Sequence, residues 1–295
     1  MNAPQPPRES SFPEFVLTPD DARFPEELRD LGEHAPVQLF ARGAIETLEH
    51  RPRVAIVGTR RATAYGLRVT RELATAFARA GAVVVSGMAS GIDGAAHRAT
   101  LDAGGLTIGV LGTGLDQVYP RSHVALHAEV AEHGLLLTEL YHDDHGMKFT
   151  FLHRNRLIAA LCSVVIVVEA PERSGALNTF EHAAVLGRTI GAVPGAIDQP
   201  QSAGANQVIR DGGTIITSIE DALALAALTP PPRIPRGNPK GDAARIWIAL
   251  ETGGLDIDTL CAKSGLPASQ CMAAVTELEI AGSIECAMSG IIRRR

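Results

Sequence analysis

The segment VAIVGTRRATAYG, from Val54 to Gly66, decides how the rest of the chain is interpreted. Its first half is a continuous apolar run, and its second half passes through glycine and two arginines into residues that favour a helix. Continuous rather than alternating hydrophobicity is typical of a strand that is buried on both faces of a sheet. The segment therefore predicts a buried strand, a turn and the start of a helix.

Six more apolar runs of the same kind follow it along the chain. They are AVVVSG (82–87), TIGVLGTG (107–114), GLLLTE (134–139), SVVIVVEA (163–170), TIGAVPG (189–195) and TIITS (214–218). Buried strands that alternate with helices predict an α/β fold, here an extended Rossmann-like doubly wound sheet. Ligands of such sheets gather at the carboxyl ends of the strands, where the small residues of these runs lie.

The composition of the chain changes several times along its length and predicts four regions. Residues 1–16 are mostly polar and proline-rich, and we expect a disordered lead-in. Residues 17–228 form the Rossmann-like domain, in which residues 24–48 add a short helical and extended segment. Residues 229–241 are a proline-rich linker, because prolines cannot continue a helix. Residues 242–295 form a second, small domain.

Three helices and a hairpin are predicted for that C-terminal domain. ARIWIAL indicates the first helix, DIDTLCAKSG the second, ending at Gly265, and PASQCMAAVTELEIAG the third, ending at Gly282. Two short strands around Met288-Ser289-Gly290 complete a winged-helix arrangement, which is a variant of helix-turn-helix.

Charge and composition exclude some classes of protein. The formal net charge of −6 gives no overall attraction to nucleic acid or to an anionic membrane, so any anion must be bound by a local group of donors. No run approaches the roughly 18 apolar residues that a membrane span needs. The four cysteines show no C-x-x-C pairing, which favours a reducing cytoplasm.

The sequence predicts neither a cofactor nor a metal ion. The segment GTGLDQVYP has Gln117 where the dinucleotide fingerprint G-x-G-x-x-G requires glycine, and no P-loop motif occurs. The run HDDH (142–145) is interpreted as a solvated loop, because no further residues at ligand spacing accompany it.

Local anion donors are concentrated in three segments. GTRRATAYG (58–66) opens a helix after a strand, which suits a phosphate, although an ordinary turn with surface arginines has the same pattern. SGMASGIDGAAH (86–97) has more small residues than a turn needs, which suits close approach of a sugar-phosphate chain. KFTFLHRNR (148–156) interleaves cations with aromatic residues, as single-strand binding sites do. A core phenylalanine with salt-bridged arginines is the alternative.

The apolar run after Arg156 indicates that a helix or buried segment begins there. Cations at a helix start are disfavoured by about 0.3–1 kcal/mol each unless an anion is present. The expected anion is a nucleic-acid backbone.

Taken in order, these segments together with VVIVVEAPERSGALNT, GRTIGAVPG and SAGANQVIRDGG resemble the signature segments of the DNA-processing protein A family, also called Smf. The resemblance runs from about Phe24 to Ser218. It implies a protein that binds and shields single-stranded DNA and helps to load a RecA-type recombinase in natural transformation. It also implies a homodimer formed through the Rossmann-like domain. A C-terminal winged-helix domain is common in this family.

Our hypothesis is a cytoplasmic, non-enzymatic single-stranded DNA binder. Phe151 would stack on a base or brace the loop, and the phosphates at the strand ends would be held by Gly58, Arg60, Ser86, Gly87, Lys148, Arg154, Asn155, Arg156 and Ser174.

Two alternatives belong to other classes. ERSGALNTFEH resembles the loop of nucleotide phosphoribohydrolases, but His182 stands where their catalytic glutamate falls. The chain could instead be an interaction protein whose acidic winged helix recruits partners, because the predicted third helix offers Gln270, Thr276, Glu277 and Glu279 and no cation. Duplex DNA could be contacted nonspecifically by Arg293, Arg294 and Arg295.

Overall fold

The structure, a computed structural model, describes residues 12–229, 240–280, 283–287 and 290–294. It separates into two units, Met1–Pro230 and Pro231–Arg295, which we call the Rossmann-like unit and the winged-helix unit. In the part of the chain that the structure describes, no helix has the length and apolar character needed to cross a membrane.

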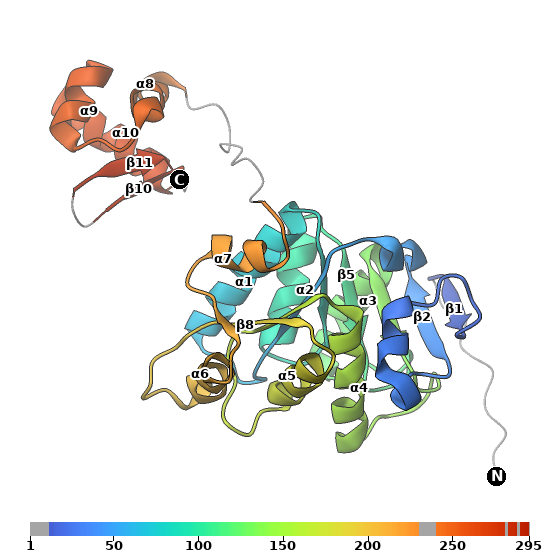
Figure 1. Ribbon diagram of the computed structural model, residues 1–295. Coiled ribbons are helices and arrows are strands. Elements are labelled where there is room, and N and C mark those ends of the chain that lie inside the picture. Colours follow the sequence, from blue (N-terminus) through green and yellow to red (C-terminus); the bar gives the residue numbers. More distant parts are fainter. Residues whose placement is uncertain (1–11, 230–239, 281–282, 288–289, 295) are drawn as a thin grey trace, which may run out of the picture. The chain divides into compact units, whose positions relative to one another are not determined.

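A nine-stranded sheet organises the Rossmann-like unit (Figure 1), in the order β1-β2-β6-β5-β4-β3-β7-β8-β9. The strands from β3 to β9 are parallel, and β1 and β2 join antiparallel beside β6. Their bounds are β1 Glu14–Leu17, β2 Leu39–Gly43, β3 Arg53–Val57, β4 Val83–Ser86, β5 Thr107–Val110, β6 Leu135–Thr138, β7 Val164–Val167, β8 Thr189–Ala192 and β9 Thr214–Ile215.

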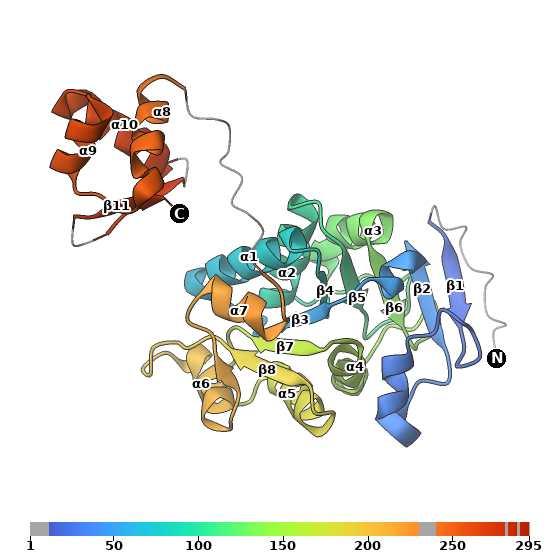
Figure 2. The same cartoon turned by 45° about the horizontal axis from the view of Figure 1, so that its top comes forward.

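Helices cover both faces of this sheet (Figure 2), with α1, α2 and α3 on one side and α4, α5 and α6 on the other. Their bounds are α1 Ala64–Arg79, α2 Ile92–Asp102, α3 Val124–His133, α4 Lys148–Leu161, α5 Gly175–Val185, α6 Ala203–Arg210 and α7 Ile219–Leu225. The short 3-10 helices are η1 Glu26–His34, η2 Ile45–Glu49, η3 Arg121–His123 and η4 Pro200–Ser202. The predicted doubly wound fold is confirmed.

The core consists of two apolar layers, one on each face of the sheet, because the central strands are buried on both sides. Ala55 and Val57 of β3 pack into the layer under α4 and α5, whereas Val54 and Ile56 pack into the layer under α1 and α2. In β3, β4 and β7, every residue is buried. This two-sided burial explains why the apolar runs in the sequence do not alternate.

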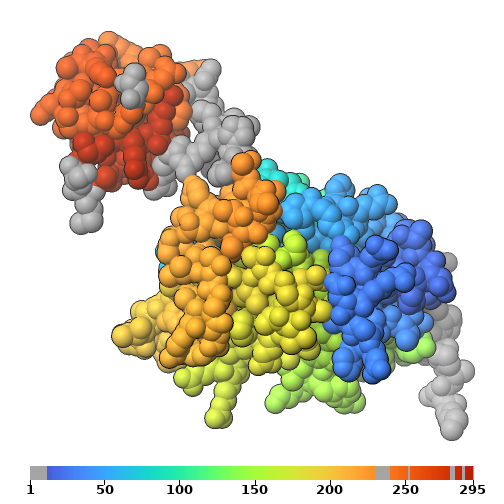
Figure 3. Space-filling model, in the orientation of Figure 1, coloured from blue at the N-terminus to red at the C-terminus, as the bar shows by residue number. Residues whose placement is uncertain are grey.

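The N-terminal segment was not foreseen as part of the sheet. The lead-in predicted to be disordered covered residues 1–16, and this is wrong for residues 14–16, which begin β1; residues 1–11 lie outside the described residues. Leu17 is fully buried and Phe15 pairs with Ala41 of β2, so the short apolar run adds an edge strand. Figure 3 shows the blue surface of the N-terminal part of this unit beside a yellow surface, and Asp30 of η1 pairs with Arg188, which follows α5, at 2.6 Å.

The winged-helix unit has the predicted arrangement of three helices and a hairpin. Its elements are α8 Gly241–Ala249, η5 Leu250–Thr252, α9 Ile257–Ser264, α10 Ala268–Ile280, β10 Ile284–Cys286 and β11 Ile292–Arg294. Gly265 has the left-handed conformation, φ 67°, that ends α9 as expected. Gly282, the Met288-Ser289 turn and most of the predicted linker lie outside the described residues.

Candidate nucleic-acid interface

A cleft of about 620 Å³ opens at the carboxyl ends of the parallel strands. It is lined by loops that follow β3, β4, β5 and β7 and by the first turns of α4. Successive strands are added in one direction from β3 to β6, and β7 then lies on the other side of β3. The cleft therefore lies at the point where the strand order reverses, which is where open α/β sheets bind their ligands.

One arginine and two aromatic rings meet in the cleft. The ring centroids of Tyr119 and Phe151 lie 5.0 Å apart with the planes inclined by 48°. The guanidinium carbon of Arg60 lies 5.5 Å from the Phe151 centroid and 5.9 Å from that of Tyr119. Arg60 is exposed and Tyr119 is 47% exposed, so both a cation and a π surface face solvent.

Three more cations surround this group: Arg61, Lys148 and Arg173 all line the cleft and are exposed. Lys148 is the first residue of α4 and Phe151 follows three residues later, so both project from the same side of the helix into the cleft. We call Arg60, Arg61, Tyr119, Lys148 and Arg173 the rim. Its four charges are all positive.

Two buried side chains of opposite charge, Asp93 and Arg154, form the base of the cleft, which we call the floor. Arg154 donates from Nη1 to the carbonyl oxygens of Gly87, at 2.8 Å, and Val110. The Asp93 carboxylate accepts a hydrogen bond from the backbone N–H of Ala89 at 3.4 Å. Burial raises the pKa of Asp93, opposed by the charge of Arg154, and burial lowers the pKa of Arg154 to about 10. Among the described residues that line the cleft, Asp93 is the one acid, so the accessible field is positive.

The start of α4 differs from the prediction. The helix begins at Lys148 and not near Arg156, because Met147 and Thr150 form the capping box: the backbone N–H of Met147 donates to Thr150 Oγ1 at 2.8 Å. Arg154, Asn155 and Arg156 therefore lie in the buried middle of the helix. The placement of these residues at a helix start was wrong.

Arg156 is held by a carboxylate inside the protein. Its Nη1 and Nη2 donate to the two oxygens of Glu139 at 2.7 and 2.6 Å, and it does not line the cleft. For this residue the structure agrees with the alternative of a salt-bridged arginine.

Ser86 and Gly87 are likewise not brought to the cleft. Ser86 is fully buried and its hydroxyl donates to the carbonyl of Ile56 at 2.7 Å. A Cβ on Gly87 would lie 2.5 Å from Arg154 Nη2, so this glycine makes room for the floor arginine. Gly58 does line the cleft, but its missing side chain makes room for Ile92 of α2.

Asn155 and Ser174, which were predicted to hold phosphate, line the cleft, and both already take part in hydrogen bonds within the protein. Asn155 donates from Nδ2 to the carbonyl of Gly175 at 3.1 Å, and Ser174 caps α5 by accepting from the N–H of Ala176 at 3.3 Å. Asn155 therefore ties the middle of α4 to the start of α5, and Ser174 caps that start beside the cleft.

The sequence interpretation did not place Tyr119, Arg173 or Asp93 in the site. Tyr119 lies in the segment GTGLDQVYP (112–120), and its aromatic ring after a predicted strand was the available signal. Arg173 directly precedes the predicted Ser174, so its charge could also have been found. The Asp93–Arg154 pair had no signal, because 61 residues separate the two side chains along the chain.

In the winged-helix unit, the predicted cations are engaged within the unit. Arg293 Nε pairs with Glu285, and Arg294 donates to the carbonyl of Trp247 while its guanidinium lies 4.3 Å from the Trp247 ring centroid. Arg295 lies outside the described residues. The exposed side of α10 presents Met272, Thr276, Glu277 and Glu279.

Fold and cleft together define an extended Rossmann-like protein that has a cationic and aromatic cleft at its topological switch point and an appended winged-helix unit. The family model described as DNA recombination-mediator protein A matches residues 15–227, and that of the DprA winged helix domain matches residues 228–288. The chain belongs to the DNA processing protein A (DprA/Smf) family.

Curated relatives support this assignment. The DNA processing protein DprA of Streptococcus pneumoniae is 41% identical over 213 residues, which are 72% of this chain and 74% of the relative. Protein Smf of Escherichia coli is 35% identical over 295 residues, covering 96% of this chain and 78% of that protein.

Two solved structures have the same fold. The X-ray structure of DprA from Streptococcus pneumoniae superposes with a TM-score of 0.68 at 40% identity, covering 72% of this chain and 74% of that one. DprA from Helicobacter pylori, whose structure is described as showing a single-stranded DNA binding mode, gives a TM-score of 0.66 at 31% identity, covering 72% of this chain and 95% of that one.

Proposed function

We propose that the protein binds single-stranded DNA in the cleft, protects it, and loads a RecA-type recombinase during natural transformation. The observation that carries the proposal is the rim, in which exposed cations surround a tilted aromatic pair. The relatives named above, one of them described by its binding of single-stranded DNA, support the DNA-binding part of the proposal.

The rim suits a single strand better than a duplex for a physical reason. Phosphates would be held by Arg60 and Lys148, while an unpaired base would stack on Phe151 and Tyr119. Bases inside a duplex are already stacked on their neighbours, so they cannot offer a free face to the aromatic pair. Affinity would therefore combine a salt-sensitive phosphate contribution with a base contribution that only a single strand provides.

The cleft does not favour the alternative that this protein is a nucleotide phosphoribohydrolase. Thr179 of α5 lines the cleft, but His182 does not, and the one acid among the described lining residues, Asp93, is buried beside Arg154. A general acid or base must reach the bond that it cleaves. We therefore propose a non-enzymatic role. We also propose that the protein acts in the cytoplasm as a homodimer formed through the Rossmann-like unit.

A second candidate role belongs to the winged-helix unit. The described exposed side chains of α10 include two carboxylates and no cation, so this helix suits contact with a protein partner better than contact with a duplex. Deleting residues 243–295 tests this role: unchanged recombinase loading by the truncated chain would argue against partner recruitment.

The proposal is tested by fluorescence anisotropy of a labelled single-stranded oligonucleotide at several salt concentrations, with unlabelled duplex as competitor. We expect salt-sensitive binding that prefers the single strand. Arg60→Ala and Lys148→Ala should each weaken binding and reduce the slope of log K against log salt by about 0.7. Arg79→Ala, at the opposite end of α1, is the matched control. Wild-type affinity in both rim variants would show that the cleft is not the DNA site.

A further inference from the structure

Four ionisable side chains from four different segments meet next to the rim loops, and we call them the loop-anchoring cluster: Glu14, Arg42, Asp116 and His142. Arg42 of β2 is its centre. It donates from Nε to Glu14 Oε1 at 2.7 Å, from Nη2 to Asp116 Oδ1 at 2.5 Å and from Nη1 to the carbonyl of Leu115 at 2.9 Å. One buried guanidinium thus joins β1 and β2 to the loop that follows β5.

The cluster joins the two loops that end at the rim. Asp116 belongs to the 111–120 loop, which carries Tyr119, and His142 belongs to the 139–147 loop, which leads into Lys148. The N–H of Gly114 donates to the carbonyl of Asp144 at 2.8 Å, and that of Asp116 donates to the carbonyl of His142 at 2.9 Å.

Glycines allow the closest approach of these loops. A Cβ on Gly114 would overlap the carbonyl oxygen of Tyr141, and one on Gly146 would overlap that of Gly112. A Cβ on Gly112 would lie 2.5 Å from the Phe151 ring. The aromatic pair and the first turn of α4 are therefore positioned by backbone contacts that the loop-anchoring cluster holds in place.

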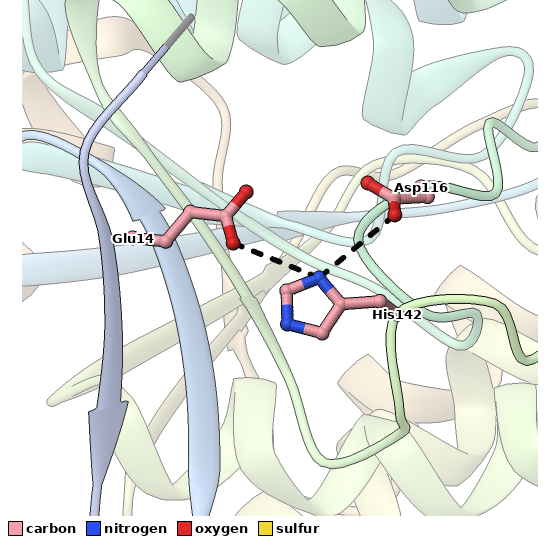
Figure 4. Close-up of side chains that lie close together, drawn as sticks. All are labelled: Glu14, Asp116 and His142. Atoms are coloured by element: carbon pink, nitrogen blue, oxygen red, sulfur yellow. Dashed lines mark ion pairs between the residues drawn. The ribbon is translucent and has the colours of Figure 1, made fainter. Parts of the chain in front are cut away.

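One nitrogen of the cluster has no hydrogen-bond partner. His142 Nδ1 is shielded from solvent and lies 3.7 Å from Glu14 Oε2 and 4.0 Å from Asp116 Oδ2, as Figure 4 shows. The ring packs edge-on against Phe40 of β2, with the centroids 5.4 Å apart. A proton on this nitrogen would point between two carboxylates.

Charge balance favours a proton over a metal ion at this position. Glu14, Asp116 and His142 place three possible ligand atoms within 4.8 Å of one another, but Arg42 already offsets one of the two carboxylate charges. An imidazolium would leave two anions facing two cations, whereas a divalent ion would leave an excess positive charge beside the guanidinium. His127 of α3 is also near; burial, with the charge of Arg42, lowers its pKa to about 4, so it stays neutral.

We propose that the loop-anchoring cluster positions the two rim loops and couples their order to protonation of His142, so that single-stranded DNA is bound more tightly in acid than in alkaline solution. Imidazole is the side chain that gains its proton between about pH 5 and 8. The inference rests on the proposed function, because it concerns the same cleft.

The experiment compares wild type with His142→Gln in the oligonucleotide assay between about pH 5.5 and 8 at constant ionic strength. Wild type should bind roughly 3- to 10-fold more tightly at the acid end, which corresponds to about 0.6–1.4 kcal/mol. His142→Gln should keep the alkaline affinity throughout. The salt slope of wild type should not change with pH, because no phosphate contact is added.

His145→Gln is the matched control, because His145 lines the cleft. A protonated His145 would add a phosphate contact and steepen the salt slope. If the pH response persists in His142→Gln, or disappears in His145→Gln together with a change in the slope, the inference is wrong. A tighter complex on adding Zn²⁺ near neutral pH, abolished by a chelator, would also overturn it in favour of a metal site.

Hydrogen exchange of the DNA-free protein separates failure of the inference from failure of the proposed function. Amides of the 111–120 and 139–147 loops should be better protected at the acid end, after correction for intrinsic rates, in wild type and not in His142→Gln. Glu14→Gln, whose carboxylate is partly exposed, should lose the same response. Coupled protection without DNA binding would refute only the function, and binding without coupled protection would refute only the inference.

Discussion

The floor and the rim of the cleft contain the same kind of side chain in opposite states. Arg154 in the floor is 5% exposed and donates to two backbone carbonyls near the buried Asp93, whereas Arg60 in the rim is exposed and lies against two aromatic rings. Arg60 lies in the loop that follows β3, and Arg154 lies in α4. Both line the same cleft. A cation next to a glycine-rich loop can therefore either stabilise that loop or remain available to a ligand, depending on whether it is buried.

The winged-helix unit adds a second case of engaged cations. Arg293 and Arg294 lie at the surface of a fold that is associated with DNA binding, yet both bond to groups of their own unit. Surface position alone therefore does not make a cation available to phosphate.

The largest expected effect concerns the floor. Arg154→Met removes the positive charge near the buried Asp93 and the hydrogen bonds to two buried carbonyls, and we expect the free energy of unfolding to fall by about 3–5 kcal/mol. Urea unfolding followed by far-ultraviolet circular dichroism measures it. Arg61→Met, in the rim, should stay within about 0.5 kcal/mol of wild type. A loss below about 1 kcal/mol for Arg154→Met would remove the distinction between floor and rim.

The next effect concerns the aromatic part of the rim. Tyr119→Ala should weaken single-stranded DNA binding by about 1–3 kcal/mol, because a stacking surface is lost, and it should leave the salt slope unchanged. Tyr119→Phe keeps the ring and should bind nearly like wild type. Equal affinities for the alanine and phenylalanine variants would show that Tyr119 does not stack on a base.

A pH-dependent effect concerns the buried His97 of α2, which is hydrogen-bonded to Thr107 Oγ1 at 2.7 Å. Burial lowers its pKa to about 3 from an ordinary value near 6.5, so between these values the unfolded chain binds the extra proton. Stability should therefore rise with pH in that window, by up to about 1.4 kcal/mol per pH unit from this group. His97→Asn should flatten the dependence by that amount in urea unfolding at several pH values, and an unchanged slope would contradict the assignment.

The smallest effect is expected in the winged-helix unit. Arg293→Ala should leave single-strand affinity and its salt slope unchanged, because its guanidinium is paired with Glu285. Arg294→Ala should alter the fluorescence of Trp247, the single tryptophan, without weakening DNA binding. A salt slope reduced by about 0.7 in either variant would show that an arginine of this unit contacts a DNA phosphate. The winged-helix unit would then not differ from the rim in this respect.

The strand and helix order was predictable because burial on both faces leaves a direct record in the sequence. Each apolar run became a parallel strand, and Gly265 marked the end of α9. The antiparallel edge strands were not foreseen, since β1 is only four residues long and its register depends on pairing with β2 across 28 residues.

Within the candidate site, local spacing identified some residues and long-range pairing redefined others. Lys148 and Phe151 share one side of α4, which a three-residue spacing already indicates. Arg156 was predicted to hold a phosphate, with a salt-bridged arginine as the alternative, because nothing near it in the sequence marks Glu139 as its partner. Ion pairs between distant segments are set by the fold, so a motif lists candidate cations without saying which ones remain unpaired.

The contact between the two rim loops has a consequence for how this protein tolerates mutation. Gly112, Gly114 and Gly146 have neighbours that leave no space for a methyl group, and Gly146 also has φ 68°. In a saturation mutagenesis screen for transformation, alanine at these positions should score as poorly as loss of a rim cation. A map of functional scores would thus mark three residues as ligand contacts although they carry no side chain to offer, and only a stability screen run in parallel would tell the two groups apart.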